Sequence, residues 1–166
     1  ILDMSKIEAG KVEFQEEDVR VTDIVDHASR VFSPVAKEKN LNFKTCIADD
    51  LPERFRTDRQ RLTQIITNLL ANAFKFTKNG HVTLEARRPK AEDVLKRKDL
   101  NREQCLVFAV SDTGIGIPAD KLALIFEAFQ QVDGGTSRKY GGTGLGLSIC
   151  KELSALLGGE IQVRST

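Results

Sequence analysis

The feature that most constrains the fold of this 166-residue chain is a long amphipathic helix, predicted over residues 58–77. Its apolar residues recur at the spacing of one helical face, at Leu62, Ile65, Ile66, Leu69 and Ala73. A helix with a single apolar stripe has to bury that stripe against another layer of secondary structure. The chain is therefore expected to build at least two packed layers around this helix.

Alternating apolar and polar residues predict strands at 41–47, 82–86 and 106–110, and a further strand signal at 161–163. Three more helices are predicted: one capped by Thr22, which Pro34 should kink or restart, one over 122–129, and one over 145–157 that ends at Gly158. Helices segregated over strands that are joined as hairpins indicate an α+β fold or a two-layer α/β sandwich.

A polar stripe follows the predicted helix over 58–77, on a face next to the apolar one. It comprises Arg61, Gln64, Asn68, Asn72 and Lys75, which lie within about 60° of one another. Asparagine is a middling helix former, so helix propensity does not explain the pair at 68 and 72. An amide oxygen can bind Mg²⁺, and a lysine one turn further can reach a phosphate. A solvated helix face explains the stripe equally well.

Two glycine-rich segments favour the ligand-binding interpretation. Ser111-Asp-Thr-Gly-Ile-Gly-Ile-Pro118 directly follows a predicted strand, and Gly141-Gly-Thr-Gly-Leu-Gly-Leu147 directly precedes the last helix. Glycine lets the backbone approach a ligand, and the N–H groups at a helix N-terminus bind phosphate. The second segment is not a P-loop, because the GxxxxGK[ST] pattern is absent, and Leu147 stands where a dinucleotide fingerprint requires its third glycine.

Together these segments resemble the catalytic, ATP-binding domain of two-component sensor histidine kinases, within the superfamily of gyrase, heat-shock chaperone and mismatch-repair ATPases. The matching boxes are Asn68-Leu-Leu-Ala-Asn72-Ala-Phe-Lys75-Phe-Thr, Asp112-Thr-Gly-Ile-Gly116, Phe126-Glu-Ala-Phe129 and Gly142-Thr-Gly-Leu-Gly146. The resemblance is greatest to hybrid-type kinases. It implies a Bergerat-type ATP-binding fold, a two-layer α/β sandwich whose mixed, mostly antiparallel sheet is covered on one face by about three helices.

The resemblance also implies roles for individual residues. Asn72 would coordinate Mg²⁺, Asn68 would help to hold the metal's water shell or a phosphate, and Lys75 would reach the phosphates. Asp112, as a buried carboxylate, would accept a hydrogen bond from the adenine amino group. The other nucleotide-binding residues would be Phe76, Gly114, Gly116, Ile117, Gly142, Thr143, Gly144, Leu145 and Gly146.

By the same resemblance, residues 130–141 would form a lid over ATP, with a plain surface loop as the alternative. Arg138 and Lys139 are candidates for contact with the γ-phosphate, and Arg138 joins Asn68 and Lys75 as a catalytic candidate. Hydrolysing members of the superfamily carry Glu at the position of Asn68. Because an amide cannot accept a proton from water, Asn68 favours phosphoryl transfer over hydrolysis. The alternatives are a non-catalytic nucleotide-binding regulatory module and a hydrolysing ATPase of the same superfamily.

The resemblance divides the chain into residues 1–14, the end of a dimerisation helix, and residues 15–166, a catalytic domain truncated at its C-terminal strand. The family's phosphoacceptor motif is absent, since His27 is interpreted as structural and His81 has no partner pattern. We therefore expect binding of ATP and Mg²⁺ without self-phosphorylation. The implied partners are the protein's own dimerisation domain and a downstream response-regulator receiver domain. A homodimer is implied for the full-length protein, and a monomer is compatible with this fragment.

The charge balance gives no reason to expect a nucleic-acid partner, because 25 basic residues face 24 acidic ones, for a net charge of +1. The basic stretch at 87–104 is interleaved with acidic residues, so it is interpreted as a solvated hairpin insertion. Cys46, Cys105 and Cys150 have neither zinc-site nor disulfide spacing and are expected to be small buried hydrophobes. A cytoplasmic location follows as an expectation, with a membrane anchor compatible with the full-length protein.

Overall fold

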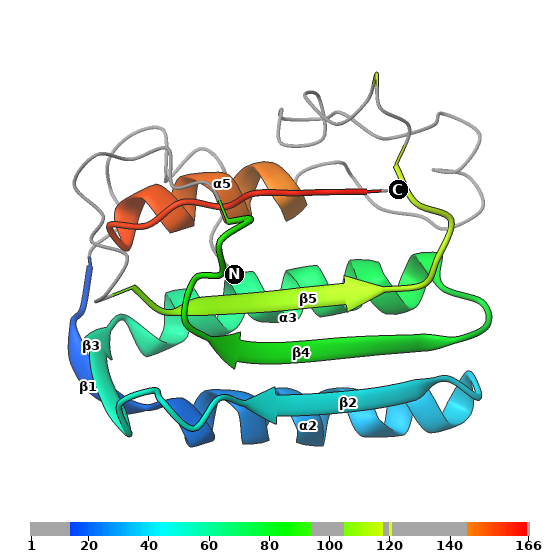
Figure 1. The fold of residues 1–166 in the computed structure, drawn as a ribbon, viewed down its shortest axis with the longest axis horizontal. Helices are drawn as coiled ribbons and strands as arrows, with labels where there is room; N and C mark the ends of the chain where they lie inside the picture. Colours follow the sequence, from blue (N-terminus) through cyan, green and yellow to red (C-terminus); the bar gives the residue numbers. More distant parts are fainter. Residues whose placement is uncertain (1–13, 94–104, 118–119, 121–145, 166) are drawn as a thin grey trace.

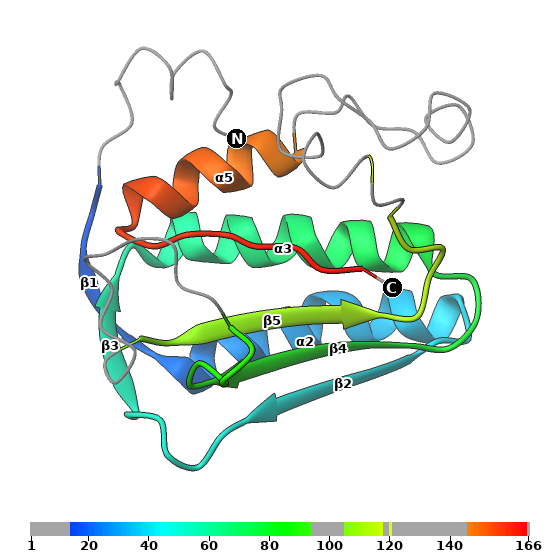
Figure 2. The same cartoon turned by 45° about the horizontal axis from the view of Figure 1, so that its top comes forward.

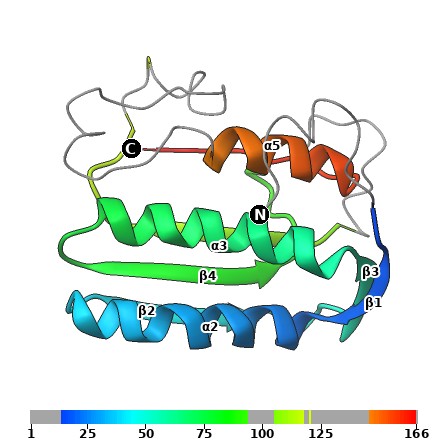
Figure 3. The ribbon, with the colours of Figure 1, turned by 180° about the vertical axis from the view of Figure 1, so that it is seen from behind.

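The computed structural model describes residues 14–93, 105–117, 120 and 146–165. Within these ranges the chain forms two layers, strands on one side and helices on the other (Figures 1 and 3). In chain order the elements are β1 (Glu17–Arg20), α2 (Val21–Glu38), β2 (Asn42–Ile47), β3 (Arg54–Thr57), α3 (Arg59–Phe76), β4 (His81–Arg87), β5 (Val107–Asp112) and α5 (Gly146–Leu156).

The main sheet described has the strand order β2-β4-β5. β2 and β4 are parallel, with Asn42 opposite His81 and Ile47 opposite Ala86. A parallel pair needs a crossover connection, and α3 lies in that connection. β4 and β5 are antiparallel, from Val82 opposite Asp112 to Arg87 opposite Val107, so residues 88–106 join the strands of a hairpin as expected.

Three helices form the second layer of the described part of the chain, and Figure 3 shows them side by side in front of the strands. α2 packs against β2 and α3 against β5, while α5 packs against α3. This arrangement confirms the expected α+β, two-layer class with a mixed sheet. A two-stranded antiparallel sheet of β1 and β3 flanks the main sheet, and neither strand was predicted from the sequence.

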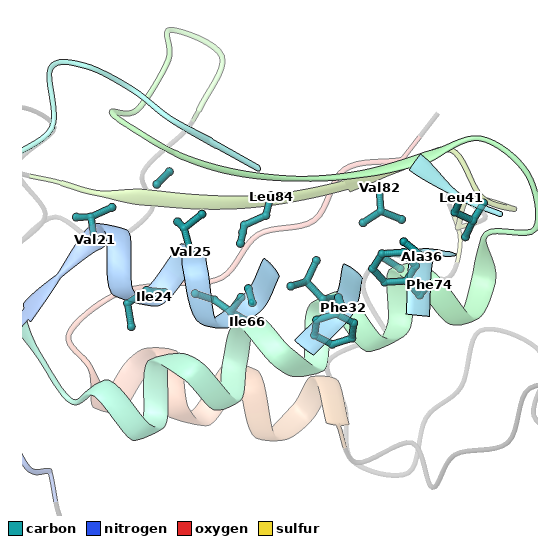
Figure 4. Close-up of a cluster of buried hydrophobic side chains, with 14 of the residues drawn as sticks. Val21, Ile24, Val25, Phe32, Ala36, Leu41, Ile66, Phe74, Val82 and Leu84 are labelled. Carbon is teal, nitrogen blue, oxygen red and sulfur yellow. The ribbon is translucent and has the colours of Figure 1, made fainter. Parts of the chain in front are cut away.

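The main core lies between α2, α3 and the sheet (Figure 4). Phe74 of α3 stacks on Phe32 of α2 at 5.5 Å between ring centroids and meets Phe43 of β2 edge-on at 5.4 Å. Val82 and Leu84 of the central strand are fully buried against the same cluster. Each large apolar side chain buried in this way stabilises the fold by about 1.5–3 kcal/mol. Packing of the predicted amphipathic faces therefore holds the two layers together.

The predicted start of α2 is wrong. The helix begins at Val21, its N-cap residue is Arg20 with no side-chain cap, and Thr22 is exposed. Pro34 does not restart the helix, which continues to Glu38. Pro34 lies on the exposed face, where solvent can satisfy the carbonyl that its missing N–H leaves free, and burial of the opposite face maintains the helix.

The strand predicted at 161–163 is not formed. Ile161 and Val163 are half-buried and Gln162 is exposed, so the expected alternation is present, but the segment joins neither of the sheets formed by the described residues. It runs back alongside α5, on the side of that helix that faces the strands (Figure 2). Ile161 packs against a small cluster formed by Ile65, Cys150 and Leu153. Among the described residues, side-chain packing and the hydrogen bonds of Arg164 and Ser165 fix this part of the chain.

The expectation that all three cysteines are buried is correct only for Cys150. Cys46 is exposed on β2, and Cys105 is half-buried just before β5. Cys46 lies on an outer strand of the described main sheet, where its side chain faces away from the helix layer. Alternation along the strand decides this position, and residue type alone could not reveal it.

Candidate functional site

The polar face of α3 carries the first group of predicted site residues. Asn68, Asn72 and Lys75 are all half-buried, at helical spacing on consecutive turns. The Lys75 ammonium lies 5.7 Å from the ring centroid of Phe76, which is also half-buried. This face is thus neither part of the core nor fully solvated. Such partial burial is what a ligand-binding face requires, because its polar groups stay accessible while neighbouring packing restricts their motion.

Cys150 of α5 contacts the side chain of Asn68. Its Nδ2 atom lies 3.7 Å from Sγ of Cys150, and that sulfur lies 3.8 Å from the carbonyl oxygen of Ile65, to which the thiol donates. Burial raises the pKa of the Cys150 thiol from 9.0 to about 11, so the S–H is intact at neutral pH. Since the thiol donates to Ile65, its lone pairs accept from the amide nitrogen of Asn68. The amide oxygen of Asn68 takes no part in this contact.

The C-terminal end of α3 is tied to the segment that follows β5. The last carbonyls of a helix lack partners within the helix. The ammonium of Lys39 donates to the carbonyl of Phe74, and the backbone N–H of Ile115 donates to the carbonyl of Phe76 at 3.3 Å. The Asn-rich box and the first glycine box, which are distant in sequence, are therefore joined by backbone contact.

Gly114 makes this close approach possible. A Cβ atom at this position would lie 2.5 Å from the Phe76 carbonyl oxygen, 2.8 Å from Oγ1 of Thr77 and 2.9 Å from Oδ1 of Asp112. Atoms cannot approach a carbon this closely, so only glycine fits without displacing the backbone of α3. The first glycine of the box thus has a structural role in addition to its predicted role beside a nucleobase.

Asp112 ends β5, and its Oδ1 accepts a hydrogen bond of 2.8 Å from the N–H of Gly114. The expectation of a buried carboxylate is wrong, because Asp112 is exposed. It pairs with Val82 at the end of the β4–β5 hairpin, where the chain leaves the sheet. The carboxylate is therefore open to a ligand while one of its oxygens is held by the glycine box.

The remaining described residues of this box are arranged around the same end of the sheet. Gly116 has a positive φ of 72°, a conformation that favours glycine. Ile117 is half-buried, and its N–H donates to the hydroxyl of Ser165 at 2.8 Å. Ile115 between them is 58% exposed, an unusual position for a large apolar side chain. The turn thus presents an open apolar surface next to the Asp112 carboxylate.

Several predicted site residues lie outside the described part of the chain, and so does the whole lid segment 130–141. They are Arg138, Lys139, Gly142, Thr143, Gly144 and Leu145. Gly146, the last residue of the second glycine box, is the first residue of α5 that the structure describes, at the N-terminus of the described helix. The partial positive charge of such a terminus favours an anion.

Other parts of the described structure show fewer signs of chemistry. His27 on α2 and His81 at the start of β4 are both exposed, and no group of three or more potential metal-binding His, Cys, Asp or Glu residues occurs in the described ranges. A polar groove of about 450 Å³ lies at the N-terminal ends of α2 and α3, and it includes none of the predicted site residues.

None of the described helices combines the length and apolarity that crossing a bilayer requires.

The structure adds two residues to the site, Thr77 and Cys150, to which the sequence had assigned no role in it. Thr77 is fully buried beside Gly114, and Cys150 contacts Asn68. Thr77 is the last residue of the first box and Cys150 follows the second glycine box by four residues, so their positions in the sequence could have suggested a role. Their contacts join segments 37 and 82 residues apart, which no local pattern reveals.

Comparison with known proteins agrees with this geometry. A family profile, described as "Histidine kinase-, DNA gyrase B-, and HSP90-like ATPase", matches residues 57–166. Over 163 residues the chain is 40% identical to the sensory/regulatory protein RpfC of Xanthomonas campestris, which corresponds to 97% of this chain and 21% of RpfC. It is 39% identical over 165 residues to the autoinducer 2 sensor kinase/phosphatase LuxQ of Vibrio vulnificus, covering 99% of this chain and 18% of LuxQ. The chain thus spans about a fifth of the length of these relatives.

Two solved structures are similar to this chain in fold. The crystal structure of full-length ShkA in complex with AMPPNP superposes with a TM-score of 0.74 at 31% identity, over 97% of this chain and 31% of ShkA. The catalytic domain of the histidine kinase ThkA has the same fold, with a TM-score of 0.64 at 24% identity over 88% of this chain and 82% of that domain.

Proposed function

This chain belongs to the family of histidine kinase-, DNA gyrase B- and HSP90-like ATPases, and we propose that it is the ATP-binding catalytic domain of a hybrid-type sensor histidine kinase. Its reaction would transfer the γ-phosphoryl group of ATP to a histidine of a dimerisation domain. The observation that carries the proposal is the face of α3, where Asn68 and Asn72 lie half-buried one turn apart beside α5. The same helix ends against the exposed Asp112 and the first glycine box.

The residues present fit a nucleotide that carries Mg²⁺. Two half-buried amides one turn apart provide neutral, hard oxygen ligands, which suit a cation that keeps several of its waters. Asn72 would coordinate the metal, Asn68 would hold its water shell or a phosphate oxygen, and Lys75 would bind the phosphates. Mg²⁺, when bound, supplies charge neutralisation at the phosphate oxygens.

The base would lie at the other end of α3. Asp112 would accept from the adenine amino group through the oxygen that Gly114 does not hold, with Gly116 giving the turn its shape. Phe76 and Ile117 would line the pocket as apolar walls. The phosphates would then extend toward the start of α5, where the backbone amides of Gly142, Thr143, Gly144, Leu145 and Gly146 would bind them, and Arg138 or Lys139 of the lid would contact the γ-phosphate.

The amide at position 68 favours transfer over hydrolysis. A hydrolytic site needs a group that accepts a proton from the attacking water, and the amide of Asn68 cannot accept one. Its nitrogen is also engaged by Cys150, so its oxygen is the atom available to the site. Catalysis would then depend on positioning the phosphoryl group and neutralising its charge.

Reconstitution tests the proposal. The chain would be mixed with a separately made dimerisation domain that carries its phosphoacceptor histidine, with Mg²⁺ and γ-labelled ATP. We expect label on the dimerisation domain and none on this chain alone, and Asn72→Ala should abolish the transfer. Tight ATP binding without any transfer would contradict the kinase assignment and support a regulatory binding module.

A carboxylate at position 68 tests the choice between transfer and hydrolysis. Asn68→Glu would supply the missing proton acceptor, and we expect faster ATP hydrolysis, by roughly tenfold or more, together with a loss of transfer. Asn68→Gln, which keeps the amide, is the control and should show no gain. Release of inorganic phosphate measures both. An unchanged hydrolysis rate in Asn68→Glu would count against this role for position 68.

The other parts of the proposal concern the whole protein. Its partners would be its own dimerisation domain and a response-regulator receiver domain, in a homodimer. Residues 1–14 would be the end of the dimerisation helix, and of these only Phe14 lies within the described part of the chain. A cytoplasmic location of this domain stays a prediction.

A further inference from the structure

Thr77 follows the last turn of α3 as its C-cap residue and is 0% exposed. Its hydroxyl group has no hydrogen-bond partner among the residues that the structure describes. Leaving a buried hydroxyl unsatisfied costs about 1–3 kcal/mol, whereas an apolar group of the same shape would avoid that cost. A valine would fill nearly the same space, so the presence of this hydroxyl needs an explanation.

The hydroxyl lies beside the carboxylate that the proposed function assigns to the adenine base. Oγ1 of Thr77 and Oδ1 of Asp112 lie 2.8 and 2.9 Å from the same point, the position of the Cβ atom that Gly114 lacks. Within the described structure, the Asp112 carboxylate accepts a hydrogen bond of 2.8 Å from the N–H of Gly114. A carboxylate has about four lone-pair positions, so Asp112 can accept from a second donor.

We propose that Thr77 is a positioning residue of the base pocket, whose hydroxyl donates to Asp112 when adenine is bound and so orients that carboxylate toward the adenine amino group. The inference rests on the proposed function. A base over Asp112 would remove water from a carboxylate that is exposed in the present structure. The loss of water has to be compensated by other donors, and Thr77 is the unused donor next to it. Thr77 itself stays buried and need not touch the nucleotide.

The test compares Thr77→Val with the unaltered chain. Because the hydroxyl has no partner in the described structure, its removal should leave the melting temperature without nucleotide unchanged or raised. Affinity for Mg²⁺·ATP should fall by roughly 10- to 150-fold, the loss expected for one hydrogen bond to a charged group. Thr77→Ser keeps the hydroxyl and should retain most of the affinity. Titration calorimetry and thermal unfolding give these values.

Two further measurements separate positioning from packing. Purine riboside triphosphate lacks the amino group that Asp112 would bind, so Thr77→Val should weaken its binding little. In a double-mutant cycle, Thr77→Val should cost little more in an Asp112→Asn background. Equal losses for both nucleotides, additive losses in the cycle, or unchanged ATP affinity in Thr77→Val would overturn the inference while leaving the proposed function standing. Failure of the unaltered chain to bind ATP would overturn the proposed function, and this inference with it.

Discussion

At the scale of single residues, the candidate site depends on two small side-chain differences, a glycine at position 114 and an amide at position 68. Gly114 has no Cβ, and three oxygens therefore lie within 3 Å of the point where a Cβ would be. Asn68 has an amide where hydrolysing relatives are expected to have a carboxylate. In both cases a single small change of side chain would alter the site.

Gly114→Ala tests the close approach between the glycine box and α3. The new methyl group would lie 2.5 Å from the carbonyl oxygen of Phe76, so we expect a destabilisation of roughly 1–3 kcal/mol and weaker ATP binding. Gly159→Ala is the matched control, because its Cβ would make an ordinary contact of 3.7 Å with the carbonyl oxygen of Ser154. Urea unfolding and ATP titration measure both effects. Equal behaviour of the two variants would refute the steric argument.

At the scale of elements, α3 is fixed at both ends by groups distant in sequence. At its start, Asp58 is 4% exposed and accepts from the N–H of Arg61 at 3.1 Å and from the N–H of Gln15 at 3.0 Å. At its end, Lys39 and Ile115 donate to the last carbonyls. The helix that carries the proposed metal and phosphate ligands is thus also the element that joins the N-terminal segment to the glycine box.

Asp58→Ala removes the N-cap and the link to Gln15 in one step. We expect the free energy of unfolding to fall by about 1–2 kcal/mol, with the urea midpoint lowered accordingly. Asp50→Ala is the control, since Asp50 is an exposed aspartate in the turn after β2. Circular dichroism during urea unfolding measures both variants. If Asp58→Ala were no less stable than the control, the capping role would have to be abandoned.

The sequence predicted the long helix α3 more accurately than it predicted which of its residues are buried, and it missed the two shortest strands. Helical periodicity placed α3 to within a residue, because its buried face is long and regular. It did not predict that Leu70 and Phe74 are buried while Leu62 and Leu69 are only half-buried, since two helices and a sheet contact α3 from different directions. The strands β1 and β3 have four residues each and were missed, because segments so short carry no reliable alternation.

At the scale of the molecule, one carboxylate joins the β4–β5 connection to the end of the chain. Asp93 accepts from Arg87 at 2.6 Å, from the N–H of Lys90 at 2.7 Å and from Arg164 at 3.0 Å. The hydrogen bond from Arg87 is the largest of the effects that lower the pKa of Asp93 from 3.8 to about 2, against an opposing effect of burial. The predicted hairpin insertion is therefore anchored at its start, although its sequence suggested only a solvated loop.

The stabilisation by Asp93 should depend on pH. A carboxylate whose pKa is lowered by folding stabilises the folded state above its unfolded pKa, and that contribution is lost as the pH falls through the folded value. We expect Asp93→Asn to lower the melting temperature by roughly 3–8 °C at pH 7 and by progressively less as the pH falls from about 4 to 2. Glu92→Gln, at the neighbouring exposed residue, should have little effect. A difference that stays constant down to pH 2 would contradict the ion-pair explanation.

The sequence by itself determined the two-layer class, the position of the long helix and the boxes that identify the family. These features are local, because helical periodicity, strand alternation and glycine spacing can each be recognised within a short segment of the sequence. Only the tertiary structure decided that Asp112 is exposed, that Cys150 contacts Asn68, and that the hydroxyl of Thr77 is buried beside Gly114 with no hydrogen-bond partner among the described residues. Burial and hydrogen bonding at these positions depend on residues up to 82 positions away, so they exist only once α3, α5 and the sheet have packed together.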